Sequence, residues 1–231
     1  LGDRETTILS ELKVVRASYD YLLDDVFCNV RIITKFDVPA GYLPEQSTRK
    51  EVYEFIIQEL IENIPNLSEE VNSEYYGRFN KWAGYTLLAK MYLNSEVFSD
   101  GAHKDYDKCI EACNKVLECG KYNMETVRKN VFVTNNENSK EIIFALPFDE
   151  TYVTDWNAFD FHMYSLQPEN QATYNFKATP WGGACVIPQY IESFDPDDQR
   201  LKDDFISGPQ YDKNGGVLYC TIGNMKGKPL D

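Results

Sequence analysis

Apolar residues recur at helical spacing through the first half of the chain. Over residues 4–26 they fall three or four positions apart, which predicts an amphipathic helix. The apolar positions of this run are Leu9, Leu12, Val15, Tyr19, Leu22 and Leu23. A second run, residues 52–64, follows the sequence Thr48-Arg49-Lys50-Glu51, which fits a capping box. Pro65 is expected to end this second helix.

Two more helices are predicted at residues 80–94 and 105–119. Asn80 can cap the first of them, and the small residues Ala83, Gly84 and Ala89 allow another helix to approach closely. Together the two helices form a pair of about 40 residues that resembles a tetratricopeptide unit. Cys109 and Cys113 lie four positions apart, where such a unit places small packing residues. We therefore expect both thiols to be reduced and buried between helices.

The pattern changes after residue 120. Residues 141–146 form a short apolar run, either a strand or a buried extended segment. Residues 147–190 are rich in proline, glycine, asparagine and aromatic residues and show little periodicity, as is typical of a functional loop. A short helix is expected near 188–194. The sequence therefore predicts a mostly α fold, with a helical scaffold at 1–120 and a loop-rich ligand-binding part at 121–231.

Net charge narrows the classes of partner. The 231 residues carry a formal charge of −14, and no cluster of lysine and arginine is present. Nucleic acid is therefore not an expected partner, because a phosphate backbone requires a basic face. No stretch of about 18 apolar residues occurs, so we expect no transmembrane segment.

Candidate catalytic and metal-binding residues are few. The only histidines are His103 and His162, and neither lies in a recognisable nucleophile motif. The aspartates of the turn at 195–198 could ligate calcium, but their spacing fits a solvated acidic turn better. We therefore expect no enzymatic activity, no cofactor and no structural metal.

Aromatic residues provide the strongest indication of function. Tyrosine is unusually frequent, with 16 in the chain. Tryptophan and tyrosine rings can stack on the C–H face of a sugar, while nearby carboxylates and amides bind its hydroxyl groups. The residues in the loop that suit this chemistry are Tyr152, Asp155, Trp156, Asn157, Tyr174 and Trp181. The alternative is that these aromatics only pin the loop to the helices.

Two tryptophans stand out among these candidates. Trp156 ranks first because Asp155 and Asn157 flank it. Trp181 ranks second because Gly182 and Gly183, which follow it, would let a ligand approach the backbone.

Several motifs, in order along the chain, resemble the SusD/RagB family of outer-membrane nutrient-binding lipoproteins. Gly77-Arg78-Phe79-Asn80-Lys81, leading into Leu87-Leu88-Ala89-Lys90-Met91-Tyr92-Leu93, is the most specific of them. The others are Arg16-Ala17 with Tyr19 and Tyr21, Phe27 to Ile32, Thr48 to Ile57, Glu141 to Phe144, and Phe194 to Leu201. The similarity covers nearly the whole chain.

The resemblance implies a fold, a function and a location. The expected fold is a set of tetratricopeptide-like helix pairs with long loops that carry a glycan site. The expected function is non-catalytic binding of an oligosaccharide or polysaccharide, at the outer face of a Bacteroidetes-type outer membrane, and delivery to a SusC-like TonB-dependent transporter. The alternative is a helical-repeat adaptor that binds a protein or peptide. An acidic protein suits neutral glycans better than polyanionic ones.

The chain also departs from the family pattern. It looks like an internal fragment of a family member, with the lipid anchor expected upstream. Cys28 and Arg31 stand where the family usually has glycine and proline. If that glycine position requires a positive φ, Cys28 is expected to be strained.

Overall fold

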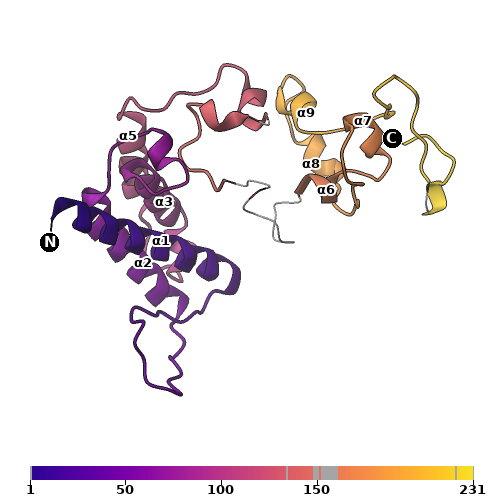
Figure 1. The fold of residues 1–231 in the computed structure, drawn as a ribbon. Coiled ribbons are helices and arrows are strands. Elements are labelled where there is room, and N and C mark those ends of the chain that lie inside the picture. Colours follow the sequence, from indigo (N-terminus) through magenta and orange to yellow (C-terminus); the bar gives the residue numbers. More distant parts are fainter. Residues whose placement is uncertain (1, 134, 148–150, 152–160, 222, 231) are drawn as a thin grey trace. The chain divides into compact units, whose positions relative to one another are not determined.

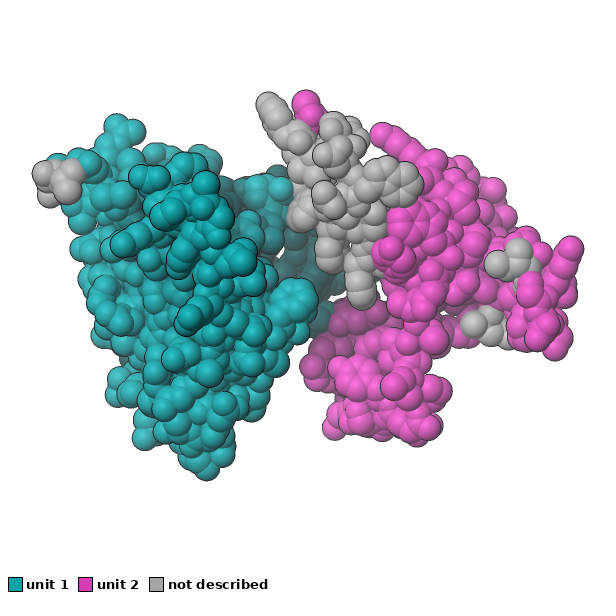
Figure 2. Space-filling view, turned by 90° about the horizontal axis from the view of Figure 1, so that it is seen from below, with its two compact units in different colours: residues 1–147 teal, residues 148–231 magenta. Residues whose placement is uncertain are grey.

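The computed structural model describes residues 2–133, 135–147, 151, 161–221 and 223–230. They fall into two compact units, residues 1–147 and 148–231, which are described separately below (Figure 2). Neither unit contains a described helix that is long and apolar enough to cross a membrane.

Unit 1 is built from helices, as predicted. They are α1 (Asp3–Phe27), α2 (Arg49–Asn63), α3 (Lys81–Leu93), α4 (Ser95–Phe98) and α5 (Tyr106–Leu117) (Figure 1). Short 3₁₀ turns are η1 (Ile64–Asn66), η2 (Ser73–Tyr75), η3 (Arg128–Phe132) and η4 (Asn136–Asn138). The helix α1 packs against α2, α2 against α3, and α3 against α5. The helix pair expected at 80–94 and 105–119 is therefore confirmed.

The predicted caps start the second and third of these helices. The Glu51 backbone N–H donates to the Thr48 hydroxyl, 3.3 Å away, and the Thr48 N–H donates to the Glu51 carboxylate at 2.8 Å. This reciprocal pair completes the capping box of α2. At the start of α3, the Asn80 side chain accepts from the Ala83 N–H at 2.9 Å.

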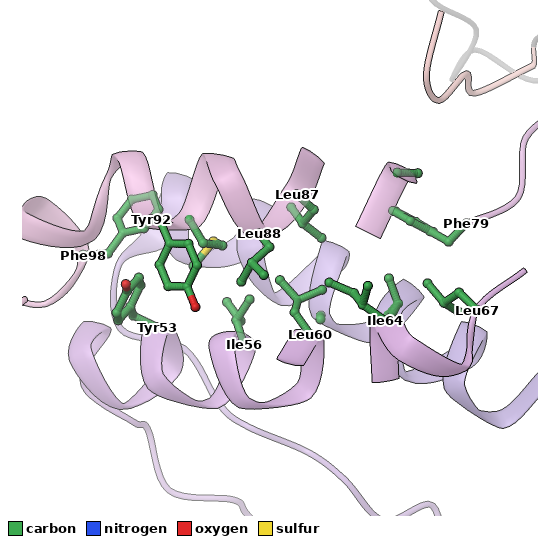
Figure 3. Close-up of a cluster of buried hydrophobic side chains, with 14 of the residues drawn as sticks. Tyr53, Ile56, Leu60, Ile64, Leu67, Phe79, Leu87, Leu88, Tyr92 and Phe98 are labelled. Carbon is green, nitrogen blue, oxygen red and sulfur yellow. The ribbon is translucent and has the colours of Figure 1, made fainter. Parts of the chain in front are cut away.

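The core of unit 1 lies between α2 and α3. Figure 3 shows Tyr53, Ile56 and Leu60 of α2 pointing toward α3 residues such as Leu88 and Tyr92. All five side chains are buried. Gly84 permits this close packing, because a Cβ atom there would lie 2.8 Å from Cγ1 of Ile64.

Helix α1 packs on the rest of unit 1 mostly through a face other than the apolar stripe that the sequence predicted. Ser10, Val14, Ala17 and Asp24 are the fully buried positions. The predicted stripe is largely exposed: Leu9 47%, Leu12 59%, Tyr19 63%, Leu22 52% and Leu23 41%, with Val15 partly packed on the core. The helix was predicted correctly, but its buried face was wrong, because α1 carries apolar residues on two sides.

Ion pairs add to the contact between α1 and the rest of unit 1. Arg16 of α1 pairs with Glu59 of α2. Glu11 of α1 accepts two hydrogen bonds from Arg78, at 3.0 Å to Nε and 2.5 Å to Nη2. This bidentate geometry is the stronger form of a carboxylate–guanidinium contact.

The connection between α1 and α2 begins at a strained residue. Cys28 caps α1 with φ 62° and ψ −81°. It is one of three non-glycine residues with a positive φ among the described residues. The strain expected from the missing glycine is therefore present. Residues 29–47 then run without regular secondary structure, and a bond from the Ser47 N–H to the Val30 carbonyl, 2.8 Å long, joins the two ends of this connection.

The cysteines of α5 differ from the prediction. Ala112 and Val116 form the buried face of α5, and Cys109 is only partly buried. Cys113 is exposed, one helical turn further along. Both are free thiols, but the prediction that both are buried was wrong, because the packed stripe of α5 passes beside Cys113.

The apolar run at 141–146 is an extended segment that forms no strand. Ile143 and Phe144 pack against the core, and the Phe144 ring stacks on Phe79 with centroids 4.4 Å apart. Of the two interpretations of this run, the extended segment is therefore correct, but its residues are only partly buried, and Leu146 is 68% exposed.

Unit 2 consists of short helices joined by loops. They are α6 (Phe161–Ser165), α7 (Asn170–Tyr174), α8 (Pro188–Glu192) and α9 (Arg200–Asp203), with the 3₁₀ turn η5 (Gly223–Met225). The short helix predicted near 188–194 is α8. Among the described residues, β pairing is limited to two isolated antiparallel bridges, Tyr211 with Val217 and Tyr219 with Pro229. The mostly α fold is confirmed.

Candidate functional site

Trp181 is held in place through its backbone. Its N–H donates to the Met163 carbonyl of α6 at 2.7 Å, and the Ala184 N–H donates to the Tyr164 carbonyl at 2.9 Å. The preceding Pro180 is fully buried, and Met163 is 7% exposed. These contacts fix the 180–184 segment along α6.

Trp181 is nevertheless accessible to solvent. The residue is 48% exposed, and its neighbour Tyr164 is 51% exposed. The two rings meet edge to face, with centroids 5.1 Å apart and planes at 85°. An edge-to-face pair is a favourable aromatic geometry. The result is a fixed, accessible aromatic surface rather than a residue buried to pin the loop.

Backbone conformation accounts for the two glycines after Trp181. Gly182 has φ 71° and Gly183 has φ 124°, values that side-chain-bearing residues rarely adopt. A Cβ atom on Gly182 would also lie 2.9 Å from the Gln167 side chain. Around Gly183, in contrast, there is open space, so the backbone beside Trp181 is accessible there.

Tyr174 belongs to a different aromatic pair. It ends α7, is 47% exposed, and lies against Phe176 with ring centroids 5.6 Å apart. Gln171 of α7 connects this region to the segment before Trp181, because its side chain donates to the Phe176 carbonyl and accepts from the Thr179 hydroxyl at 2.7 Å. Of the predicted site residues, Trp181 and Tyr174 are therefore both accessible but lie in separate pairs.

The remaining four predicted site residues lie outside the described residues. They are Tyr152, Asp155, Trp156 and Asn157. Tyr164, in contrast, contacts the Trp181 ring but was not among the predicted site residues. It is separated from Trp181 by 17 positions, and nothing in the local sequence pattern indicates that the two rings meet.

A concave surface lies in unit 1, between α2 and α5. Its volume is about 310 Å³, and His103, Glu54 and Asp105 are among its lining residues. The His103 Nε2 atom is 3.1 Å from a Glu54 oxygen, and the Tyr53 hydroxyl donates to Asp105 at 3.1 Å. Burial, followed by the nearby Asp105 charge, raises the pKa of Tyr53 well above its ordinary value.

Asp105 is the centre of this cluster, and its contacts are structural. Lys108 lies 2.8 Å from one oxygen, and the Asp105 N–H donates to the Ser95 hydroxyl at 2.9 Å. Partial burial opposes ionisation, but the hydrogen bonds from Lys108 and Tyr53 outweigh it, so the pKa of Asp105 is lowered. The carboxylate therefore links α2 to α5, and the backbone N–H of the same residue adds α4.

The described residues contain no group of three or more histidine, cysteine, aspartate or glutamate side chains that could hold a metal ion. In the acidic turn, Asp195 accepts from the Asp197 N–H at 2.9 Å, and Asp198 pairs with Arg200. The carboxylates of Asp195 and Asp198 are thus bonded within the turn and to Arg200.

The first 93 residues match a known family. Residues 3–93 match the SusD-like family model described as "Starch-binding associating with outer membrane". Two curated proteins are also similar to the chain. A SusD-like protein of Bacteroides ovatus is 28% identical over 155 residues, covering 64% of this chain and 28% of the relative. The starch-binding protein SusD of Bacteroides thetaiotaomicron is 27% identical over 144 residues, covering 61% and 25%.

The fold is similar to that of a solved glycan-binding protein. Surface glycan-binding protein A from Bacteroides thetaiotaomicron, solved in complex with laminarihexaose, superposes with a TM-score of 0.70 at 21% identity. The match covers 87% of this chain and 43% of that protein. The matched region thus spans about a quarter of the length of the two curated relatives and under half of the length of surface glycan-binding protein A. In sequence and in fold the chain is therefore similar to SusD-like proteins, of whose length it spans a part.

Proposed function

We propose that the protein binds a neutral glycan without catalysis, at a surface that includes Trp181. The exposed but fixed indole of Trp181 is the observation that carries this proposal. An accessible aromatic surface is what glycan binding needs, whereas an adaptor that used the loop only as scaffold would bury the same rings. The one relative named for starch binding, and the similar structure solved with laminarihexaose, support a glycan as ligand.

Trp156 and its neighbours belong to the same proposal. Trp156, Tyr152, Asp155 and Asn157 would extend the aromatic and hydrogen-bonding surface, and Tyr174 would add a second ring. The cluster around Asp105 fits the non-catalytic part of the proposal, because its bonds to Lys108 and Tyr53 join α5 to α2.

The cellular role that we propose follows the family. The full protein would be lipid-anchored at the outer face of the outer membrane, where it would deliver glycan to a SusC-like TonB-dependent transporter. The family description, which names association with the outer membrane, supports this location.

The alternative, a helical-repeat adaptor for a protein or peptide, has one specific observation in its favour. The outer face of α5 exposes an apolar stripe: Tyr106 45%, Ile110 58% and Leu117 77%. Exposed apolar stripes are typical of protein interfaces.

Isothermal titration calorimetry with a panel of neutral oligosaccharides tests the proposal. Trp181→Ala should weaken binding by about 1–3 kcal/mol, as expected for loss of one aromatic anchor. Tyr211→Ala, which removes a ring of similar exposure (47%), serves as control. Unchanged affinity of a folded Trp181→Ala protein would refute the role of Trp181, and binding of peptides but no glycan would favour the adaptor.

A further inference from the structure

We propose that unit 2 contains a second sugar-binding subsite, in a groove between α7 and residues 211–221. We call it the α7 groove. Its volume is about 620 Å³, within the usual range for ligand sites of roughly 300–1,000 Å³. Neither Trp181 nor Tyr164 lines it. The inference rests on the proposed glycan binding but names different residues.

Hydrogen bonds fix both ends of the groove. At one end, the Thr173 hydroxyl donates to the Tyr211 carbonyl at 2.8 Å, and the Lys213 N–H donates to the Ala172 carbonyl at 3.2 Å. At the other end, Glu169 accepts from the Thr221 N–H at 2.7 Å and from the Thr221 hydroxyl at 2.6 Å. The two walls are thus held apart at a set width, which reduces the entropy lost when a ligand binds.

The turn that forms one wall is also rigid. Asp212 accepts from the backbone N–H groups of Asn214 at 2.7 Å and Gly216 at 2.9 Å, and its own N–H donates to the Gly216 carbonyl at 2.8 Å. The turn requires glycine at 216, because a Cβ atom there would lie 2.7 Å from the Asp212 carboxylate. Lys213 and Asn214 are exposed at its tip.

The side chains of the groove suit a neutral polyhydroxyl ligand. Tyr219 is 53% exposed and offers a ring face, and Phe176 adds a second, half-buried ring. Across the groove, the Lys213 ammonium lies 3.2 Å from the Asn175 amide oxygen. A ring face with an ammonium, an amide and the Asp212 carboxylate supplies donors and acceptors for hydroxyl groups.

Charge argues against an anionic ligand. Lys213 is the only cationic residue among those that line the groove, and Glu169 and Asp212 outnumber it. Hydrogen bonds from the backbone of Gly216 and Asn214 lower the pKa of Asp212, so this carboxylate stays ionised at neutral pH. A neutral oligosaccharide long enough to contact both the groove and Trp181 is the ligand class that we assign.

Two measurements on the 231-residue chain test the subsite. The first is a nuclear magnetic resonance titration with laminarihexaose and with maltohexaose, which should shift the backbone amide signals of Lys213, Asn214 and Thr221. The second is affinity by calorimetry, in which Tyr219→Ala should lose about tenfold, as expected for one contributing aromatic contact. Lys213→Ala should also weaken binding, and it leaves the backbone bond to Ala172 in place.

The control is Tyr211→Ala, in the same segment. Tyr211 is 47% exposed and does not line the groove, so its loss should leave affinity and amide shifts unchanged. Glycan binding that is weakened by Trp181→Ala, with no shift at 213, 214 or 221, would overturn the subsite and leave the proposed function standing. If neither oligosaccharide shifts any amide of the chain, the subsite and the proposed function both fail for these glycans.

Discussion

The buried carboxylate of Asp24 should make the stability of unit 1 depend on pH in an unusual direction. Asp24 lies in the last turn of α1 with its side chain 0% exposed. Neither of its carboxylate oxygens has a hydrogen-bond partner, and the nearest cation, Arg49 Nε, is 3.8 Å away. The Arg49 guanidinium also lies over the Phe98 ring, 4.5 Å from its centroid.

The magnitude follows from the pKa. Burial raises the pKa of Asp24 from 3.8 to about 6, against the attraction of Arg49. Below about pH 4 the carboxyl is protonated in both the folded and the unfolded chain. Between about pH 4 and pH 6 the unfolded chain releases the proton while the folded chain keeps it, so the free energy of unfolding falls as pH rises. A shift of about 2 units corresponds to about 3 kcal/mol.

Asp24→Asn should remove this dependence. The amide has nearly the same shape and does not ionise, so the variant should gain about 3 kcal/mol over the wild type as pH rises from about 4 to about 7. The value of about 3 kcal/mol already includes the attraction between Arg49 and Asp24, because that attraction contributes to the pKa of Asp24. Urea unfolding followed by circular dichroism across this pH range measures the difference.

Asp25→Asn is the matched control. Asp25 is the next residue and its side chain is exposed. Its charge is the smallest of the three contributions to the pKa of Asp24, after burial and Arg49, so the variant should keep most of the wild-type pH dependence. If Asp24→Asn and the wild type keep a constant difference in free energy across the range, then Asp24 ionises normally in the folded protein and the argument from burial is wrong.

Three further predictions concern packing, backbone strain and thiol exposure. Gly84→Ala should destabilise unit 1 by about 1–2 kcal/mol in urea unfolding, because the overpacking against Ile64 exceeds the gain in helix propensity. A stabilised variant would show that the Ile64 side chain can move away from α3 at little cost in free energy. Cys28→Gly should raise stability by about 0.5–1 kcal/mol, since glycine tolerates φ 62°; a loss in the same assay would contradict the strain. In the native protein a thiol reagent should modify Cys113 faster than Cys109, because Cys113 is exposed and burial raises the pKa of Cys109; equal rates by mass spectrometry would argue against this.

The sequence alone determined the features that depend on residues close together in the chain. The capping box at Thr48 and the cap at Asn80 each join groups three residues apart, so a local pattern contains both partners. Helical spacing likewise predicted α1, α2, α3 and α5, and the ordered motifs indicated the resemblance to SusD-like proteins that the comparisons also find. The exposed setting of Trp181 was also anticipated, from the aperiodic loop around it.

Only the tertiary structure decided which faces are buried and which distant residues meet. Periodicity shows that α1 has an apolar stripe, but it cannot show that α2 covers Val14 and Ala17 instead of Leu12 and Tyr19. The same limit applies to Trp181 and Tyr164, and to the α7 groove. Each depends on contacts between segments far apart in sequence, and such contacts are set by how whole elements pack rather than by the pattern within any one of them.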